Sequence, residues 1–195
     1  MDLKPLEQSY FEKPTLELAK DLLGKLLVKE TEEGTASGWI VETEAYIGPM
    51  DRAAHSYNNR RTARTEIMFG LPGNVYTYVM HTHCLVNVVS EGVDKPEAVL
   101  IRAVEPHMGI ELMYERRGRN KKETDLTSGP GKLTKALGIT KSDYGRSFSE
   151  SPLYIAEGRE VKEIVAGPRI GIANSGEAKD YPWRFWEKGN RFVSR

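Results

Sequence analysis

The chain has 195 residues, and 28 lysines and arginines balance 28 aspartates and glutamates, so its formal net charge is zero. This balance excludes a globally basic nucleic-acid binder, and any phosphate binding must come from local segregation of charge. The length fits one domain, 1–195, with its own core. The single cysteine, Cys84, excludes an internal disulfide framework and a zinc–thiolate cluster, and its apolar neighbours favour an inert core thiol. No stretch reaches transmembrane length and Met1–Pro5 lacks an apolar signal core, which predicts a soluble intracellular protein.

The N-terminal part of the chain predicts a helix followed by a β-hairpin. Residues 5–14 form an irregular lead-in, and Thr15 is a candidate N-cap for a helix whose apolar residues recur at helical spacing. Gly24 is expected to end that helix. Residues 25–29 predict a short strand, and the polar stretch 30–37 predicts a turn into the next strand.

The strand predicted at 38–46 carries the most informative pattern. Four residues on one face alternate with four on the other: Trp39, Val41, Thr43 and Ala45 against Ile40, Glu42, Glu44 and Tyr46. Gly48-Pro49 then breaks the strand, and His55 follows in the next loop. Carboxylates and a ring at a rigid strand end, followed by an imidazole, suit acid–base chemistry on a flat substrate. The alternative is an edge strand with solvated glutamates and a surface histidine.

The middle of the chain predicts a polar loop and a second hairpin. Residues 57–69 form either a functional loop over the site or a basic surface loop, with Arg60, Arg61 and Arg64 inside it and Arg52 just before. Strands at 75–80 and 84–90 flank a polar tip of three residues, 81–83. The first of them places Tyr76, Tyr78 and Met80 on one face, and Asn87 in the second must find hydrogen-bond partners if it is buried.

Charged residues dominate the part of the chain after the second hairpin. Arg102 lies in the apolar strand 99–104 and needs an anion or carbonyl partner there. Pro106 is expected to start a helix that runs through Tyr114. The densest positive run comes next and is either a solvated face or a basic patch: Arg116, Arg117, Arg119, Lys121 and Lys122. Residues 168–172 predict a late strand, and 183–186 predict an aromatic clasp.

Ordered motifs along nearly the whole chain resemble one enzyme family. They include Glu42-Thr43-Glu44-Ala45-Tyr46, Asp51 to Ser56, Tyr76, Tyr78, Asn87, Arg102-Ala103, Ser128-Gly129-Pro130 and Lys132-Leu133. They are similar to the alkyladenine (3-methyladenine) DNA glycosylases of the single-domain type, as distinct from the helix-hairpin-helix glycosylases. The expected fold is therefore a single mixed α/β (α+β) domain, with a curved, mostly antiparallel sheet, surrounding helices and a protruding β-hairpin near His81.

The resemblance implies an activity and a role for each matching residue. Enzymes of this family rotate an alkylated or deaminated purine out of double-stranded DNA and hydrolyse its N-glycosidic bond, with 3-methyladenine, 7-methylguanine, hypoxanthine and ethenoadenine as substrates. Glu44 resembles the carboxylate that activates water, and Tyr46, Tyr78 and His55 resemble the groups that sandwich the flipped base. Asn87 resembles the residue that crowds the amino group of normal guanine, and Arg102 resembles a contact to the phosphate of the flipped nucleotide.

The hairpin tip departs from the family pattern. His81 stands where the resemblance places the minor-groove wedge, but animal members have a tyrosine followed by a glycine, and this tip is one residue shorter. Further DNA contacts are expected from Arg116, Arg117, Lys121 and Lys122. The resemblance implies a monomer without cofactor or metal, acting in the cytoplasm or the nucleus. Glu42, one strand period from Glu44, is expected to tolerate replacement by glutamine.

Two other functions remain open from the residues alone. A metal-dependent phosphoesterase or nuclease would use Glu42, Glu44, Asp51 and His55 as ligands or bases. A non-catalytic nucleic-acid-binding module would use Tyr46 and Tyr78 only for stacking. Release of a free base in the presence of a chelator would remove both.

Overall fold

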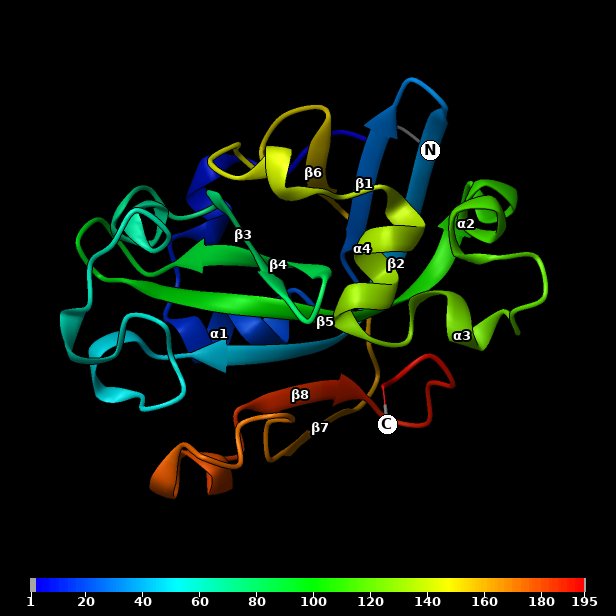
Figure 1. Ribbon diagram of the computed structural model, residues 1–195. Coiled ribbons are helices and arrows are strands. Elements are labelled where there is room, and N and C mark those ends of the chain that lie inside the picture. The colour runs from blue at the N-terminus through cyan, green and yellow to red at the C-terminus, as the bar shows by residue number, and fades with distance from the viewer. Residues whose placement is uncertain (1–2, 195) are drawn as a thin grey trace.

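The computed structural model describes residues 3–194 and shows one mixed α/β domain (Figure 1). Met1 and Asp2, the first residues of the stretch expected to lack a signal sequence, lie outside the described residues. Every strand pair within 3–194 is antiparallel, and eight strands form one curled sheet in the order β3-β4-β5-β2-β1-β6, with β8 joining β2 to β7. The strands are β1 Leu26–Thr31, β2 Gly34–Tyr46, β3 Val75–Met80, β4 His83–Ser90, β5 Glu97–Met108, β6 Leu153–Ala156, β7 Ile164–Gly167 and β8 Arg184–Glu187.

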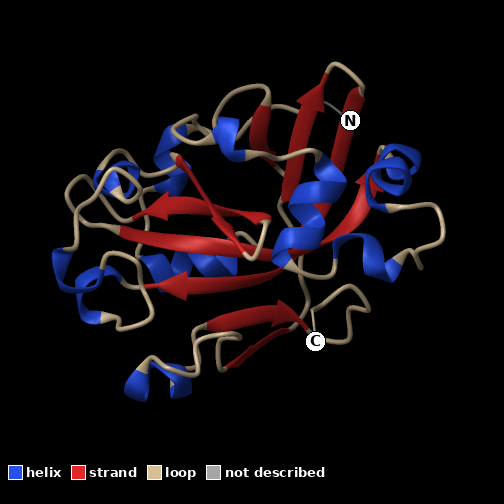
Figure 2. Ribbon diagram, in the orientation of Figure 1, coloured by secondary structure: helices blue, strands red, loops and turns tan. Residues whose placement is uncertain are grey.

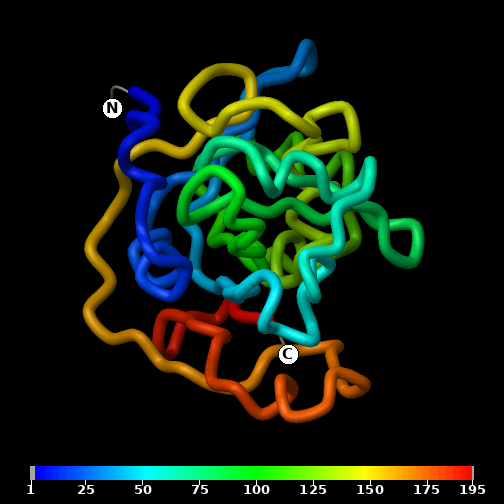
Figure 3. The backbone as a smooth tube through the Cα atoms, turned by 90° about the vertical axis from the view of Figure 1, so that its left-hand side faces the viewer, coloured from blue at the N-terminus to red at the C-terminus, as the bar shows by residue number. Residues whose placement is uncertain are grey.

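Helices are short and lie around the sheet (Figure 2). They are α1 Thr15–Asp21, α2 Ile110–Arg117, α3 Thr124–Thr127 and α4 Pro130–Leu137, and short 3₁₀ segments lie in the connections. No described helix is both long and apolar enough to cross a bilayer. The β3–β4 hairpin extends away from the body of the molecule (Figure 3), as the expected fold requires.

β2 is the central strand, which rules out the edge-strand alternative. Residues 37–46 of β2 pair with β5, while residues 34–39 pair with β1 and residues 42–44 pair with β8. A β-bulge interrupts the β2–β5 ladder between Ile40 and Glu42. Strict alternation therefore fails there: Ile40 joins the main core together with Ala45, and Val41 takes the face of Glu42 and Glu44.

One face of the sheet carries the main core and the other carries polar groups. Alternate residues of β4 and β5, such as Val86 and Ile101, pack with Leu18 of α1 and Leu133 of α4. The residues between them, such as Asn87 and Arg102, project to the opposite face, because side chains alternate along a strand. The functional residues therefore stand on a scaffold that the core holds rigid.

Several predicted boundaries are wrong. Pro14 is the N-cap of α1, and Thr15 lies inside the helix with its hydroxyl against Ser90 and Glu97. β5 continues through Pro106 to Met108, so α2 starts only at Ile110. Residues 168–172 form a loop rather than a strand, since β7 ends at Gly167, and the 183–186 clasp is mostly β8.

The hairpin tip is tighter than predicted. Met80 and His83 already pair, so the turn contains only His81 and Thr82. Both have positive φ, 47° and 71°, which is the backbone that a two-residue hairpin turn requires. His81 is thus exposed at the end of the hairpin, and its backbone is in the left-handed conformation.

Candidate active site

The polar face of the sheet holds a cavity of about 270 Å³. Four strands supply neighbouring positions in one row: Tyr76 pairs with Asn87, Asn87 with Leu100, and Leu100 with Glu44. The lining residues from the sheet include Tyr46, Tyr76, Tyr78, Asn87 and Arg102, and two loops add His55 and Ile170. The volume is near the lower end of the roughly 300–1,000 Å³ of small-molecule pockets, which suits a compact flat ligand.

Glu44 lies directly behind the cavity lining and is 0 % exposed. Its Oε1 accepts the Ile170 N–H at 2.7 Å, and its Oε2 accepts the Tyr46 hydroxyl at 2.8 Å. The Arg102 guanidinium stands 3.4 Å from Oε2. All three partners line the cavity. A ligand in the cavity could therefore reach the Glu44 carboxylate by replacing one of these contacts.

Burial raises the pKa of Glu44 above its ordinary value, and Arg102, the Ile170 N–H and the Tyr46 hydroxyl oppose that rise. The nearby Glu42 carboxylate adds to the rise. A carboxylate so poorly solvated interacts strongly with a positive charge that develops nearby.

Glu42 is not solvated; it is buried beside Glu44 and forms ion pairs with two arginines. It is 0 % exposed, and its Oε1 lies 3.1 Å from Nε of Arg102 and 2.8 Å from Nε of Arg184. The N–H and hydroxyl of Ser194 also donate to it. We therefore expect Glu42→Gln to be harmful rather than mild, because the buried Arg102 and the half-buried Arg184 both depend on the charge of Glu42. The partners that Arg102 needed in its apolar strand are these two glutamates.

Aromatic rings form one wall of the cavity. The His55 ring meets Tyr78 edge-on at 4.6 Å, and its Nδ1 shares a hydrogen bond with the Tyr76 hydroxyl at 2.7 Å. Burial, with the charges of Arg64 and Arg60, lowers the pKa of His55 to about 4, so its ring is neutral near pH 7. Burial, followed by the charge of Glu44, raises the pKa of Tyr78 to about 12, which keeps its phenol protonated. Neutral rings are suited to stacking on a flat or cationic ligand.

Asn87 combines a structural contact with a place in the cavity. Its side-chain nitrogen donates to the Tyr76 carbonyl at 3.0 Å, and the residue is 3 % exposed. The hydrogen bond fixes the amide, so its position against a ligand is set before binding. Cys84, by contrast, is half-buried and outside this cavity, and burial raises its pKa to about 11, which agrees with an inert thiol.

A second depression adjoins the cavity beside the tip of the hairpin. It shares Met80, Arg102 and Pro130 with the cavity and adds His81 and Lys132. Met80 is 47 % exposed, so an apolar side chain also stands at the mouth beside the predicted wedge His81. Sequence reasoning placed Met80 on the tyrosine face but gave it no role.

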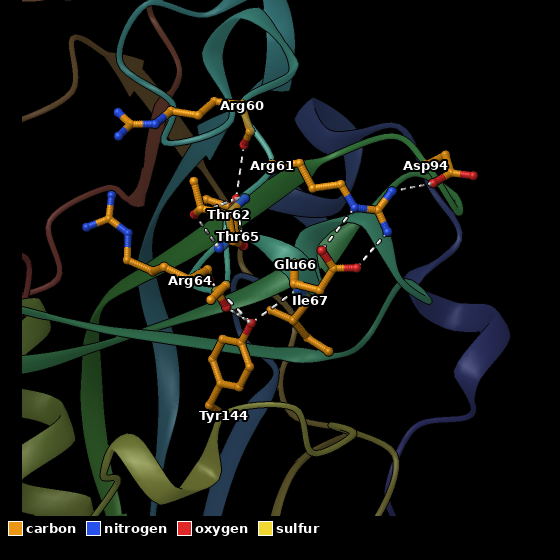
Figure 4. Close-up of polar contacts among 10 residues, drawn as sticks. Arg60, Arg61, Thr62, Arg64, Thr65, Glu66, Ile67, Asp94 and Tyr144 are labelled. Carbon is orange, nitrogen blue, oxygen red and sulfur yellow. Dashed lines mark hydrogen bonds and ion pairs between the residues drawn. The ribbon is translucent and has the colours of Figure 1, made fainter.

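The loop 57–69 is ordered by its own hydrogen bonds and is partly a cavity wall through Met68. Arg61 pairs with Glu66 and Asp94, whereas Arg60 and Arg64 point away from those acids (Figure 4). The Tyr144 hydroxyl accepts the Ile67 N–H (Figure 4) and shares its own proton between the carbonyls of Ala63 and Arg64. Within residues 3–194, neither Arg60 nor Arg64 has an acidic partner.

The predicted basic run divides into two kinds of residue. Arg116 pairs with Glu33 and donates to Thr31, and Arg117 donates to backbone carbonyls of α3. Lys121 and Lys122 are exposed and line a separate depression with Lys132 and Arg191. This depression shares Ser128 and Lys132 with the one beside the hairpin tip, so the two depressions are neighbours.

The four acids and bases proposed for a metal site do not converge. Glu42 is held by Arg102 and Arg184, and Asp51 forms a bidentate pair with Arg169. Among residues 3–194 no three histidine, cysteine or carboxylate groups gather closely enough to hold a metal ion. The geometry therefore favours a site that works with one buried carboxylate.

The C-terminal loop is the part of the site that sequence reasoning missed. Ile170, Gly171, Ile172 and Asn174 line the cavity, and Arg169 is buried beneath them. An arginine between Pro168 and three apolar or small residues was the available signal, because a charge in such a segment calls for a buried partner.

Comparison with known proteins gives one consistent result. The family model described as "Methylpurine-DNA glycosylase (MPG)" matches residues 9–191. Three bacterial relatives carry the name "Putative 3-methyladenine DNA glycosylase". The chain is 68 % identical over 192 residues to the one from Bacillus licheniformis, covering 98 % of this chain and 97 % of the relative. It is 67 % identical over 192 residues to the Bacillus subtilis protein, with 98 % and 97 % covered. It is 59 % identical over 194 residues to the Oceanobacillus iheyensis protein, with 100 % and 98 % covered.

Proposed function

Since the chain belongs to the methylpurine-DNA glycosylase family, we propose that this DNA glycosylase receives a damaged purine in its cavity and hydrolyses the base–sugar bond with Glu44. The substrates proposed are alkylated and deaminated purines: 3-methyladenine, 7-methylguanine, hypoxanthine and ethenoadenine. The observation that carries the proposal is Glu44, an almost unsolvated carboxylate immediately behind a cavity walled by aromatic rings. We also propose that the protein acts as a monomer.

The rings supply the binding energy for the base. A purine rotated out of the duplex would stack between Tyr46 on one side and Tyr78 with His55 on the other. Alkylated purines are cationic, and electron-rich faces attract a cation by about 0.5–2 kcal/mol at each ring. Asn87, whose amide is fixed by the Tyr76 carbonyl, is proposed to crowd the amino group of undamaged guanine.

Glu44 supplies the chemistry. As the bond breaks, the sugar takes on oxocarbenium character, and a nearby carboxylate stabilises that positive charge. In the free enzyme the Tyr46 hydroxyl occupies Oε2 of Glu44. We propose that water replaces this contact when the nucleotide enters, and that Glu44 orients the water toward the sugar carbon and accepts its proton.

The direct test is release of free base from duplexes that each carry one damaged purine, with excess chelator present. Release of hypoxanthine or a methylated purine, with the sugar–phosphate backbone left intact, is expected. Strand cleavage that the chelator suppresses would support a metal-dependent nuclease instead. Tight binding to damaged duplex without any released base would support the non-catalytic module.

The pH dependence of base excision should report the ionisation of the Glu44 carboxylate. The carboxylate must be ionised to act, and burial raises its pKa above the ordinary 4.5, so single-turnover excision should fall as pH decreases, with a midpoint above 4.5. His55, with a pKa lowered to about 4, stays neutral through this window and should not contribute. The rate is measured between pH 4.5 and 8 and corrected for uncatalysed depurination. A flat profile over this range would contradict the role of Glu44.

We propose that the DNA backbone runs from the cavity over the two neighbouring depressions, past the hairpin tip, to Lys121 and Lys122. Arg60 and Arg64, the two loop arginines for which residues 3–194 offer no acidic partner, would contact phosphates at the other side of the mouth. Local segregation of this kind lets a protein of zero net charge bind DNA.

The double replacement Lys121→Ala/Lys122→Ala should weaken binding to damaged and undamaged duplex equally and reduce the salt slope by about 2. Binding is measured by fluorescence anisotropy at several salt concentrations. Arg116→Ala/Arg117→Ala serves as the comparison, because these arginines already have partners within the protein and their loss should act on stability more than on the slope. If the salt dependence of binding is unchanged in the lysine variant, Lys121 and Lys122 are solvated residues that do not contact DNA.

His81→Ala should lower affinity for damaged duplex but leave excision from single-stranded DNA unchanged. The wedge fills the gap that an extruded base leaves in the stack, and a single strand has no such gap. His81→Tyr should restore or exceed the wild-type affinity, and His107→Ala, a histidine outside the cavity and the two depressions, is the control. Equal losses on both substrates would remove His81 from the wedge role and direct the same test to the exposed Met80.

A further inference from the structure

Arg169 is the most enclosed cation among the described residues, and its contacts join three separate segments. Its side chain and that of Asp51 are both 0 % exposed, and they form a bidentate pair in which Nη2 donates to Oδ1 at 2.8 Å. The same guanidinium donates to the carbonyls of Ala45 at 2.9 Å and Ala178 at 3.2 Å. A single planar group therefore fastens the end of β2 to the loop after it and to the C-terminal loop.

Asp51 extends this network toward the rings. Its carboxylate accepts the N–H of Ile47 at 3.2 Å and that of Ala53 at 3.0 Å. The turn that leads from β2 to His55 is thus organised around the carboxylate that Arg169 neutralises. Neither residue lines the cavity, so both act on the site through others.

Two of the groups held by Arg169 belong to the proposed chemistry. The next peptide along the chain, the Ile170 N–H, donates to Glu44 at 2.7 Å. The guanidinium itself lies 4.6 Å from the centre of the Tyr46 ring and 5.1 Å from that of Trp183. A planar guanidinium that donates from both terminal nitrogens is required here, since a lysine offers neither the fork nor the stacking face.

We propose that Arg169 is a positioning residue that holds the Ile170 N–H on Glu44 and the Tyr46 ring in place for the flipped base. The proposal rests on the proposed role of Glu44. Loss of the guanidinium fork would let the C-terminal loop withdraw its N–H from the carboxylate and would loosen the ring at the same time. Misplacement of catalytic groups by about 1 Å costs on the order of 100-fold in rate.

The acid side of the pH profile separates this role from a merely structural one. The charged and titratable groups that face Glu44 are Arg102 on β5, Tyr78 on β3, and Tyr46 and Glu42 on β2, with Arg184 of β8 held by Glu42. Of these groups only Tyr46 contacts Arg169, and its hydroxyl, like the Ile170 N–H, lowers the pKa of Glu44. The Ile170 N–H lowers the pKa of Glu44, so its withdrawal should raise that pKa and move the acid limb to higher pH.

The experiment compares Arg169→Lys and Asp51→Asn with wild type in single-turnover excision of hypoxanthine from duplex DNA across pH, alongside urea unfolding of each protein. Asp143→Asn is the matched control, because it breaks another buried ion pair, Lys29–Asp143, away from the cavity. We expect both site variants to lose about 10- to 100-fold in plateau rate and to shift the acid limb upward. Asp143→Asn should lower the unfolding midpoint and leave the pH profile unchanged.

Each outcome decides between the two claims. If wild type releases no base, the proposed function fails, whatever the variants do. If wild type is active and the variants lose rate without a shift of the acid limb, the inference about Arg169 is overturned. Failure of both site variants to fold, while Asp143→Asn folds, would also overturn it, because the pair would then act on the fold alone.

Discussion

Glu44→Gln is expected to abolish base release while binding to damaged duplex stays close to wild type. The amide keeps the shape of the side chain but removes the charge that would stabilise an oxocarbenium-like sugar and the basic oxygen that would accept a proton from water. It also turns an NH₂ group toward one of three donors, the Ile170 N–H, the Tyr46 hydroxyl or the Arg102 guanidinium. The loss is expected to be about 10³-fold or more, which is roughly 4 kcal/mol or more of transition-state stabilisation.

Single-turnover excision and equilibrium binding on the same duplex separate these effects. Loss of turnover with retained binding places the interaction in the transition state rather than in the ground state. Glu115→Gln, a change to an exposed carboxylate on α2, is the matched control and should behave as wild type. An excision rate for Glu44→Gln within tenfold of wild type would show that Glu44 is not the group that activates water.

Glu42→Gln is expected to destabilise the fold strongly and to impair excision through Arg102. Glu42 neutralises Arg102 and Arg184 and accepts from both donors of Ser194, and its own side chain is 0 % exposed. A buried ion pair that loses one partner typically costs about 3–5 kcal/mol, because the remaining charge stays uncompensated. Arg102 also faces Glu44 and lines the cavity, so its displacement should change the site as well as the stability.

Urea unfolding of wild type, Glu42→Gln and Arg184→Met, with the double variant, measures the coupling directly. Arg184→Met in the Glu42→Gln background should recover part of the lost stability, since it removes one of the two uncompensated charges. Additive losses in the double variant, or an unfolding free energy for Glu42→Gln equal to that of Glu115→Gln, would contradict the ion-pair account.

The sequence determined which residues can share a face. Side chains alternate along a strand, so Glu44 and Tyr46 had to lie together, as did Tyr76 and Tyr78, and the positions of Asn87 and Arg102 among apolar residues marked them as special. The ordered motifs also placed the chain in its family without any knowledge of its three-dimensional structure. The fold class and the projecting hairpin followed from that resemblance, and both are present in the structure.

Local pattern failed where the backbone departs from its regular period. The bulge beside Ile40 moved that residue into the core, and Pro106 stayed inside β5 although proline usually interrupts a strand. The loop at 168–172 had the composition of a strand, yet its backbone is used to present an N–H to Glu44. Neither bulges nor such loops change the hydrophobic pattern enough to be predicted from it.

Only the tertiary structure decided how the charges are used. Arg116 finds Glu33 at a sequence separation of 83 residues, and Arg169 finds Asp51 at 118. Register across four strands, from Tyr76 through Asn87 and Leu100 to Glu44, likewise joins segments that have no local relation in the sequence. Ion pairing and register depend on which segments the fold brings within a few ångströms of each other, because the Coulomb energy and the hydrogen bond both vanish at the distances that separate these residues along an extended chain.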